Sequence, residues 1–206
     1  MAGFAMNDRA PHRFHRPLAA ALALALAACS AGAPQAEPPL KGARIGGAFT
    51  LTDQNGRRVS DRDFAGQWRM VYFGYTFCPD VCPTDVQTMM RAREAFLKDH
   101  PQAKLAAIFI SVDPARDTPA ALGQFAGAFP RGLVALTGTP AEIADVAKRY
   151  GIYYHRAEGE TATKDAYLVD HSRQTVLFDP GGAPVALIPT DQGAQASIAE
   201  LDKWVR

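Results

Sequence analysis

Residues 68–83 read WRMVYFGYTFCPDVCP, and this stretch decides the fold. Its first part, residues 68–75, is a run of apolar, aromatic and β-branched residues with the length of a buried strand. After Pro83, apolar residues recur at the spacing of one helix face: Val86, Met89, Met90 and Leu97. We therefore predict a buried strand that leads into a helix, with Cys78 and Cys82 at the junction.

The alternation of strand and helix continues along the chain. Residues 105–112 (LAAIFISV) predict a second buried strand, and residues 133–136 predict a short third one. Between them, Thr118-Pro119 predicts a helix start, because Thr caps helices and Pro suits the first helical position. Thr139-Pro140 repeats this signal, and Glu142 adds the acidic residue of a capping box.

The remaining segments predict hairpins near both ends of the domain. Asn55-Gly56 is a strong hairpin turn signal between residues 49–52 and Val59. Further along, strand-like residues 166–169 and 175–178 bracket a turn, and a Gly181-Gly182 turn, a strand at 185–188 and a helix at 197–205 follow. This order predicts an α/β sandwich, in which helices flank a central mixed sheet with an added N-terminal hairpin.

Composition limits the classes of function. The 206 residues, 48% of them apolar and 21% charged, suit one globular domain with some additional chain. The balance of 22 basic against 21 acidic residues excludes a basic nucleic-acid binder and an acidic disordered tail. A mean hydropathy of −0.12 excludes a multi-span membrane protein. Three cysteines are too few for a disulfide scaffold, and the odd number leaves one to be explained.

The amino terminus predicts a lipoprotein signal at residues 1–28. Basic residues precede a short apolar run, residues 18–28, which is too short to span a bilayer because that needs about 20 residues. The run ends in Leu-Ala-Ala-Cys29, which resembles the bacterial lipobox, in which the cysteine sulfur is lipidated. An ordinary signal peptide with an incidental cysteine is the alternative.

If Cys29 is lipidated, residues 29–44 form a flexible Pro-rich tether and residues 45–206 form the folded domain. The domain would then lie in the bacterial cell envelope, lipid-anchored at the periplasmic face of a membrane, in an oxidising compartment.

Cys78 and Cys82 are separated by three residues, so their sulfurs converge if the segment is helical. Backbone N–H groups at a helix start favour thiolates. Such a pair can act as a redox dithiol or as two metal ligands; a structural disulfide and two inert buried thiols are the alternatives. Two thiolates suit Cu(I), or they form half of a zinc site, but the predicted domain has no further cysteine for a four-sulfur site.

A third ligand has to come from the histidines. We expect His100 and His155 at the surface, because one ends a charged helix and the other stands in polar sequence. His171 differs because it is predicted in a turn between two strands, beside Asp170, which could fix its tautomer. A site of Cys78, Cys82 and His171 would leave one coordination position open, which suits metal transfer better than storage.

A charged cluster follows the second buried strand: Asp113, Arg116 and Asp117. We interpret it as a loop stabilised by its own ion pairs and caps. The alternative is a docking surface for a partner protein.

The chain resembles the Sco/SenC family, the thioredoxin-like copper proteins of cytochrome oxidase assembly, from Gly46 to about Ile188. Four stretches carry the resemblance: residues 73–83 (FGYTFCPDVCP), 109–119 (FISVDPARDTP), 136–138 (LTG) and 167–172 (YLVDHS). The three residues between the cysteines distinguish the first stretch from ordinary thioredoxins, which have two. Members are commonly held by an uncleaved membrane helix, whereas this leader resembles a lipoprotein signal.

The resemblance implies a thioredoxin-like fold and copper, as Cu(I) or Cu(II), held by Cys78, Cys82 and His171. It further implies delivery of that copper to the dinuclear centre of cytochrome c oxidase subunit II. Further partners would be another periplasmic copper chaperone or a thioredoxin-like reductant. Some members instead reduce the subunit's cysteines, so a thiol-disulfide reductase that uses Cys78 and Cys82 as its redox pair is the alternative function.

A third hypothesis is a peroxidase, because peroxiredoxins share the fold and place a cysteine after a similar strand. Thr76-Phe77-Cys78 only loosely matches their catalytic setting. The sequence alone places no arginine beside Cys78 to hold peroxide.

Overall fold

The computed structural model describes residues 1, 3, 36–130, 132–157 and 166–206. The elements below belong to one compact unit, Pro38–Arg206. Apart from residues 1 and 3, the predicted signal peptide and Cys29 lie outside the described residues. This unit begins before Ile45, because the Leu40 N–H donates to the Val185 carbonyl at 3.0 Å. Residues 38–44, which we assigned to the tether, thus belong to the compact unit.

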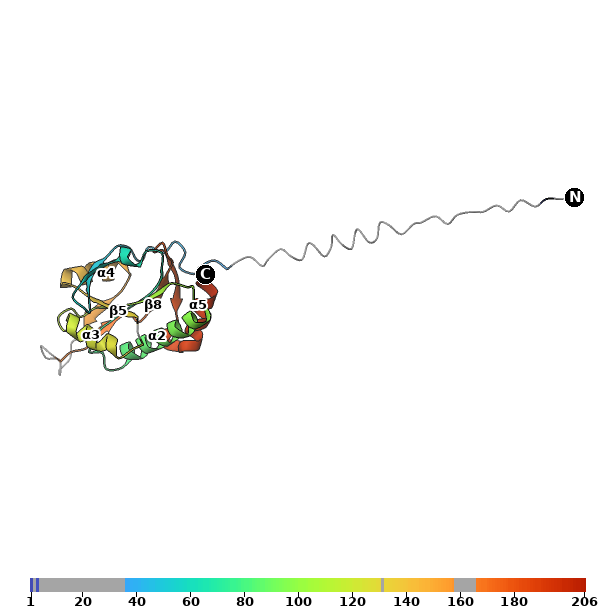
Figure 1. The fold of residues 1–206 in the computed structure, drawn as a ribbon. Helices are drawn as coiled ribbons and strands as arrows, with labels where there is room; N and C mark the ends of the chain where they lie inside the picture. Colours follow the sequence, from blue (N-terminus) through green and yellow to red (C-terminus); the bar gives the residue numbers. More distant parts are fainter. Residues whose placement is uncertain (2, 4–35, 131, 158–165) are drawn as a thin grey trace. The chain divides into compact units, whose positions relative to one another are not determined.

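A seven-stranded mixed sheet forms the centre of this unit (Figure 1), in the order β2-β1-β5-β4-β3-β8-β9. Its strands are β1 (Thr50–Asp53), β2 (Arg58–Ser60), β3 (Trp68–Gly74), β4 (Leu105–Ser111), β5 (Leu133–Thr137), β8 (Thr175–Phe178) and β9 (Pro184–Ile188). The β3–β4 and β4–β5 pairs are parallel, and the other pairs are antiparallel. The predicted mixed sheet is therefore confirmed.

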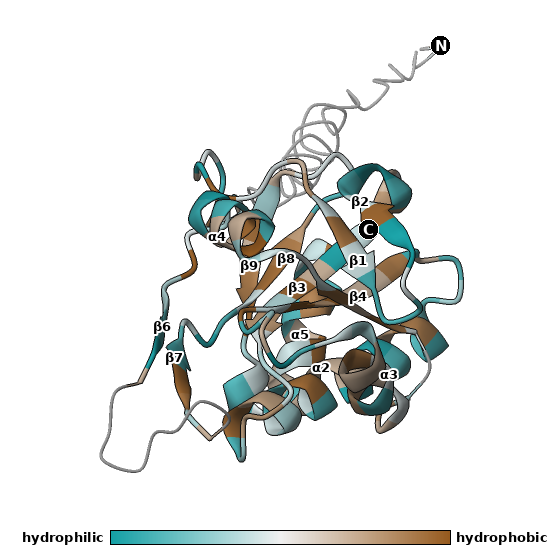
Figure 2. Ribbon diagram, turned by 90° about the vertical axis from the view of Figure 1, so that its left-hand side faces the viewer, coloured by the Kyte–Doolittle hydropathy of each residue, from teal (hydrophilic) through white to brown (hydrophobic). Residues whose placement is uncertain are grey.

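Helices cover both faces of the sheet (Figures 1 and 2). α2 (Val81–Asp99), α3 (Pro119–Gly127) and α5 (Ala194–Trp204) lie on one face, and α4 (Pro140–Arg149) lies on the other. α2 and α3 share a face because both connect neighbouring parallel strands by right-handed crossovers in the same direction. Two short 3-10 helices, η2 (Asp61–Phe64) and η3 (Thr190–Gln192), also belong to this unit.

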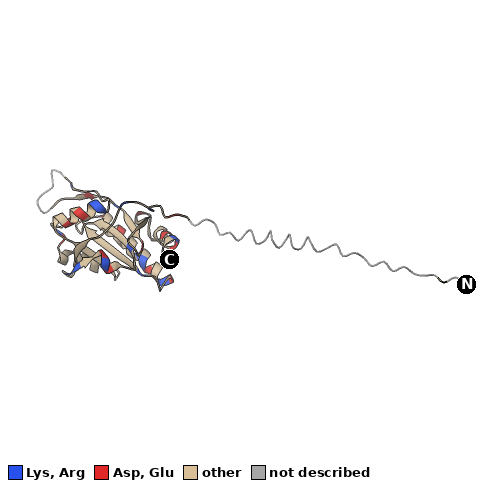
Figure 3. Cartoon of the chain, turned by 90° about the horizontal axis from the view of Figure 1, so that it is seen from above, with Lys and Arg blue, Asp and Glu red and all other residues tan. Residues whose placement is uncertain are grey.

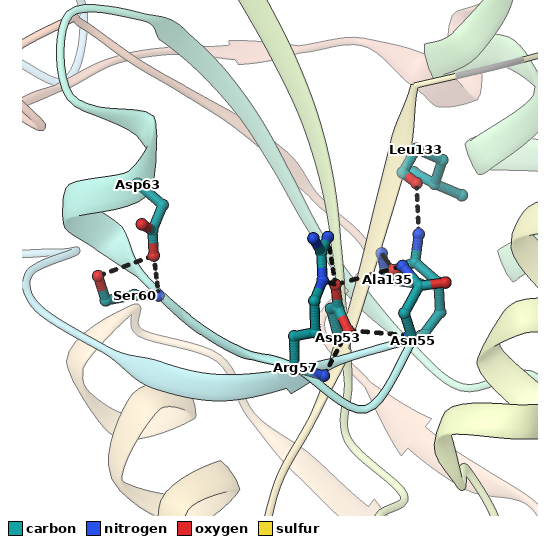
Figure 4. Close-up of polar contacts among 8 residues, drawn as sticks. Asp53, Asn55, Arg57, Ser60, Asp63, Leu133 and Ala135 are labelled. Atoms are coloured by element: carbon teal, nitrogen blue, oxygen red, sulfur yellow. Dashed lines mark hydrogen bonds and ion pairs between the residues drawn. The ribbon is translucent and has the colours of Figure 1, made fainter.

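Local sequence signals explain several of these boundaries. The Thr118 and Thr139 hydroxyls accept from the Ala121 and Glu142 N–H groups, as the predicted caps require. In the β1–β2 hairpin, Asp53 accepts hydrogen bonds from the N–H groups of Asn55 and Arg57 (Figure 4), each at 2.8 Å. Gly56 has a φ of +78°, which the predicted turn needs.

A separate two-stranded ribbon stands outside the main sheet. It consists of β6 (Tyr154–Arg156) and β7 (Val169–His171), with Tyr154 opposite His171 and His155 opposite Asp170. His171 is therefore the last residue of a strand. The prediction from sequence, which placed it in a turn, is wrong. The reason is that β7 pairs with β6, a short strand of sequence Tyr-His-Arg that is partly buried only at Tyr154 and gives no strand signal.

Burial follows the expected pattern. β4 is buried along its whole length, as is β3 after Trp68, because helices cover both faces of these central strands. Acidic and basic residues are interspersed over the helices (Figure 3). Among the described residues, no helix is long and apolar enough to cross a membrane.

Candidate metal centre

The two cysteines lie where β3 ends and α2 begins. Cys78 is in the connecting loop and Cys82 is in the first turn of α2, which begins at Val81. Both are free thiols and both are buried, with exposed fractions of 8% and 0%. The Cys82 N–H donates to the Cys78 sulfur at 3.4 Å, so the helix start turns its first N–H groups toward that sulfur.

The surroundings shift the pKa values of the two thiols in opposite directions. Burial raises the pKa of Cys78, but N–H groups of Asp80 and Cys82, together with the Cys82 and Tyr75 side chains, outweigh it and lower the pKa below its usual value. Burial raises the pKa of Cys82 far above its usual value, and the neighbouring Cys78 adds to the rise. Cys78 is thus the more acidic thiol, a distinction that the sequence did not reveal.

His171 meets the cysteines from the ribbon. Its Nε2 lies 3.2 Å from the Cys82 sulfur, and its Nδ1 lies 2.9 Å from the Ser172 carbonyl oxygen. Because a carbonyl can only accept, Nδ1 carries the proton and Nε2 presents a lone pair to the site. Burial lowers the pKa of His171, which favours this neutral form. The Tyr72 and Tyr75 rings pack edge-to-face with the imidazole, with interplanar angles of 85° and 88°. These contacts restrict the orientation of the imidazole ring.

The other predicted residues take different places. Asp170 is exposed, and the Ser172 carbonyl, not the Asp170 carboxylate, accepts from His171 Nδ1 and fixes the tautomer. The charge of Asp170 raises the pKa of His171, against the larger opposite effect of burial. His155 is exposed, as predicted. His100 is also exposed, at the end of α2, with its Nε2 3.1 Å from an Asp202 oxygen.

These donors fit a soft metal ion that enters between them. Metal–sulfur and metal–nitrogen bonds of about 2.3 and 2.0 Å at a tetrahedral angle place the two ligand atoms about 3.5 Å apart. The Cys82 sulfur and His171 Nε2 are 3.2 Å apart, so they need to separate by only a few tenths of an ångström. In the described part of the chain, no group of three or more His, Cys, Asp or Glu side chains is already arranged as a metal cluster.

Sequence reasoning missed a buried ion pair behind the site. Asp85 is fully buried on α2, three residues after Cys82, and accepts two hydrogen bonds from Arg173, which follows His171 by two residues. The Tyr72 hydroxyl donates to the same carboxylate at 3.1 Å. The sequence did carry a signal for this buried pair, because Asp85 is an acidic residue on the apolar face of the helix, next to Val86.

The charged cluster after β4 supports the loop that carries Cys78. Asp117 is fully buried and accepts from the Thr76 N–H and hydroxyl at 3.0 and 2.6 Å and from the Ser111 hydroxyl at 2.5 Å. Burial raises the pKa of Asp117 against the effect of these donors. Asp113 and Arg116 form the expected ion pair. The cluster is therefore more than a self-contained loop, because Asp117 hydrogen-bonds to Thr76, in the segment just before Cys78.

Comparison with known proteins gives consistent matches. The family model described as SCO1/SenC matches residues 37–206. Protein SenC of Rhodobacter capsulatus is 44% identical over 155 residues, 75% of this chain and 65% of the relative. Protein sco1 of Schizosaccharomyces pombe is 40% identical over 139 residues, which are 68% of this chain but 52% of the relative. The chain thus spans only about half to two thirds of the length of these relatives.

Solved structures agree with this match. The structure of Bradyrhizobium japonicum ScoI with copper bound has a TM-score of 0.69 and 38% identity, covering 78% of this chain and 99% of that one. The mixed sheet between two helical layers and the added β1–β2 hairpin confirm the predicted thioredoxin-like architecture.

Proposed function

The chain belongs to the SCO1/SenC family, and on this premise we propose that it is a metallochaperone that binds copper through Cys78, Cys82 and His171. The observation that carries the proposal is the 3.2 Å approach of a neutral His171 Nε2 to the Cys82 sulfur, beside a second thiol. Two thiolates and one imidazole suit Cu(I) better than Mg²⁺ or Ca²⁺, which prefer oxygen. Copper-bound relatives support copper as the cargo.

The geometry suits transfer of copper. Three protein ligands leave a coordination position through which a recipient's ligand can enter before the donor's ligands leave. We propose that the recipient is the dinuclear copper centre of cytochrome c oxidase subunit II, as the family resemblance implies. Another periplasmic copper chaperone would supply the copper, and a thioredoxin-like reductant would keep Cys78 and Cys82 as thiols.

We further propose that residues 1–28 are a lipoprotein signal and that Cys29 carries the lipid, which places the compact unit, residues 38–206, at the periplasmic face of a bacterial membrane. The support is the apolar run that ends at Cys29. Mass spectrometry of the protein purified from membranes tests this assignment, because a diacylglyceryl group on Cys29 gives a defined mass increase that Cys29→Ser abolishes.

Anaerobic titration with Cu(I) and with Cu(II) tests the site. Replacement of a ligand should weaken binding at least as much as the loss of a ligand's hydrogen-bond partner, which costs about 10–100-fold. We expect this loss for His171→Ala and a wild-type affinity for His155→Ala, the matched control on the neighbouring strand. If His171→Ala binds both ions as the wild type does, the three-ligand site is wrong.

A thiol-disulfide reductase remains the second candidate, because one thiol is acidified and its partner is not. In this function the Cys78 thiolate attacks a client disulfide, and Cys82 resolves the mixed disulfide. Cys82→Ser should then trap the client on Cys78, and Cys78→Ser should trap nothing. In cells that lack the gene, rescue of oxidase copper loading by added copper favours delivery, whereas rescue by a reductant favours the thiol function.

A further inference from the structure

The guanidinium of Arg116 lies among three aromatic rings that come from two different segments. Its carbon is 3.6 Å from the centroid of the Tyr167 ring, 4.9 Å from Phe77 and 5.6 Å from Tyr75. Phe77 directly precedes Cys78, and Tyr167 stands just before β7, which ends in His171. A cation over aromatic faces is attracted by their π electrons, so Arg116 draws the cysteine segment and the histidine segment together.

Hydrogen bonds fix the guanidinium in this position. Nε lies 2.5 Å from an Asp113 carboxylate oxygen, and Nη1 donates to the Tyr167 carbonyl at 2.9 Å. The Tyr167 hydroxyl donates to the other Asp113 oxygen at 2.7 Å, which closes a ring of contacts. The Arg116 and Asp113 side chains are only 12% and 4% exposed. Among the described residues, Arg116 Nη2 is buried with no hydrogen-bond partner, while the guanidinium carbon lies over the aromatic rings.

The ribbon needs such support. Among the strands that the structure describes, β7 pairs only with β6, so hydrogen bonds of the seven-stranded sheet do not set the position of His171 relative to the cysteines. Side-chain contacts perform this task. Arg173 holds the segment after His171 to α2 through Asp85, and Arg116 holds the segment before β7 to the loop that carries Cys78. The Tyr75 ring, which Arg116 also faces, packs edge-to-face with the His171 imidazole, and the two ring centroids are 5.9 Å apart.

We propose that Arg116 is a positioning residue of the metal site: it sets the separation between His171 and the cysteine sulfurs by clamping Tyr167 to Phe77 and Tyr75. Arg116 touches neither the copper nor its ligands in this proposal. The inference rests on the proposed function, because it assigns Arg116 an effect on copper binding through His171. A lysine cannot replace it fully, because an ammonium lacks the planar fork that reaches Asp113 and the Tyr167 carbonyl together.

A double-mutant cycle on Cu(I) affinity, measured by competition with a chromophoric chelator, tests the proposal. Arg116→Gln should weaken binding about 10–100-fold, the range for residues that orient metal ligands. In the His171→Ala background the same change should add little, since Arg116 acts through His171. Arg149→Gln is the matched control, because Arg149 forms an ion pair on α4 that touches none of these residues, and it should bind as the wild type does.

Each result separates the proposals. Wild-type protein that fails to bind Cu(I) overturns the proposed function itself. Wild-type protein that binds, with Arg116→Gln unchanged or with equal losses in both backgrounds, overturns the positioning function alone. If Arg116→Gln does not fold, Arg116→Lys and Tyr167→Leu take its place and should give partial losses with the same dependence on His171.

A metal-free measurement completes the test. In the apoprotein, the side-chain ¹⁵N signals of His171 report its tautomer and the contact of Nε2 with the Cys82 sulfur. We expect Arg116→Gln to shift these signals and Arg149→Gln to leave them in place. Unshifted signals in Arg116→Gln would show that the ribbon keeps its position without the clamp, against the proposal.

Discussion

Arg173 and Asp85 form a bidentate ion pair that joins the segment after His171 to the helix after Cys82. The Nε–Oδ2 and Nη2–Oδ1 distances are 2.6 and 2.7 Å. Asp85 is fully buried, whereas the Arg173 side chain is 40% exposed. The pair therefore shields a charged carboxylate beneath the metal site and ties together the two elements that supply ligands.

Arg173→Gln should lower the free energy of unfolding by about 1–3 kcal/mol, because it leaves the buried Asp85 carboxylate with the Tyr72 hydroxyl as its remaining donor. Urea denaturation measures this loss. Arg57→Gln is the control, because Asp53 keeps its bonds from the backbone N–H groups of Asn55 and Arg57. The control should lose less than about 1 kcal/mol. Equal losses of unfolding free energy in Arg173→Gln and Arg57→Gln would mean that the Asp85 pair stabilises the fold no more than the Asp53 pair does.

Stability should depend on the protonation of His171. Burial lowers the pKa of the folded-state imidazole from its ordinary value of 6.5, so below that pH the unfolded chain binds more protons than the folded one. The free energy of unfolding should therefore fall as the pH drops through 6.5 toward the folded-state pKa. Urea midpoints at about pH 7.5 and pH 5.5 measure the fall. His171→Gln should reduce it and the exposed His155→Gln should not; the same slope in all three proteins would contradict the assignment.

Local signals predicted much of the fold. Thr139 with Glu142, and Asn55 with Gly56, act within a few residues, so they determine a helix start and a turn wherever the segment lies. The buried strands β3 and β4 could also be predicted from local sequence, because a strand covered on both faces is a continuous apolar run.

The arrangement of the site could be predicted only in part. Cys78 and Cys82 are close in sequence, but the contact of His171 with Cys82 spans 89 positions and depends on a ribbon whose polar β6 strand shows no apolar alternation. The contacts by which Ser172, Asp85 and Arg116 support the metal site could not be predicted from the sequence either. These residues act through contacts between distant segments, and a backbone carbonyl carries no sequence signal at all.

Cys78 should react with iodoacetamide before Cys82. Backbone donors lower the pKa of Cys78, whereas burial raises that of Cys82 and encloses its sulfur. Peptide mass mapping after brief alkylation of the reduced apoprotein should find the label on Cys78. Cys82→Ser should keep the wild-type rate, and Cys78→Ser should lose nearly all reactivity. A label that appears first on Cys82 would reverse the order of attack proposed for the reductase function.

Gly74→Ala should harm the site without changing any ligand. A methyl group at Gly74 would lie 2.9 Å from a Tyr72 ring carbon, 3.0 Å from a Phe109 ring carbon and 3.1 Å from the Cys82 sulfur, and all of these atoms are buried. We expect a loss of about 1–3 kcal/mol in the free energy of unfolding, as for other overpacked cores.

Cu(I) affinity should fall in the same variant, because the sulfur is pushed off its line to His171. Gly123→Ala is the matched control. Gly123 lies within α3, where a methyl group would meet its nearest neighbour, the Gln54 carbonyl oxygen, at an ordinary 3.7 Å. Because alanine favours helices over glycine by roughly 1 kcal/mol, the control should be as stable as the wild type or more so, with unchanged copper binding. Wild-type copper affinity in Gly74→Ala would show that the Cys82 sulfur can shift without cost to the site.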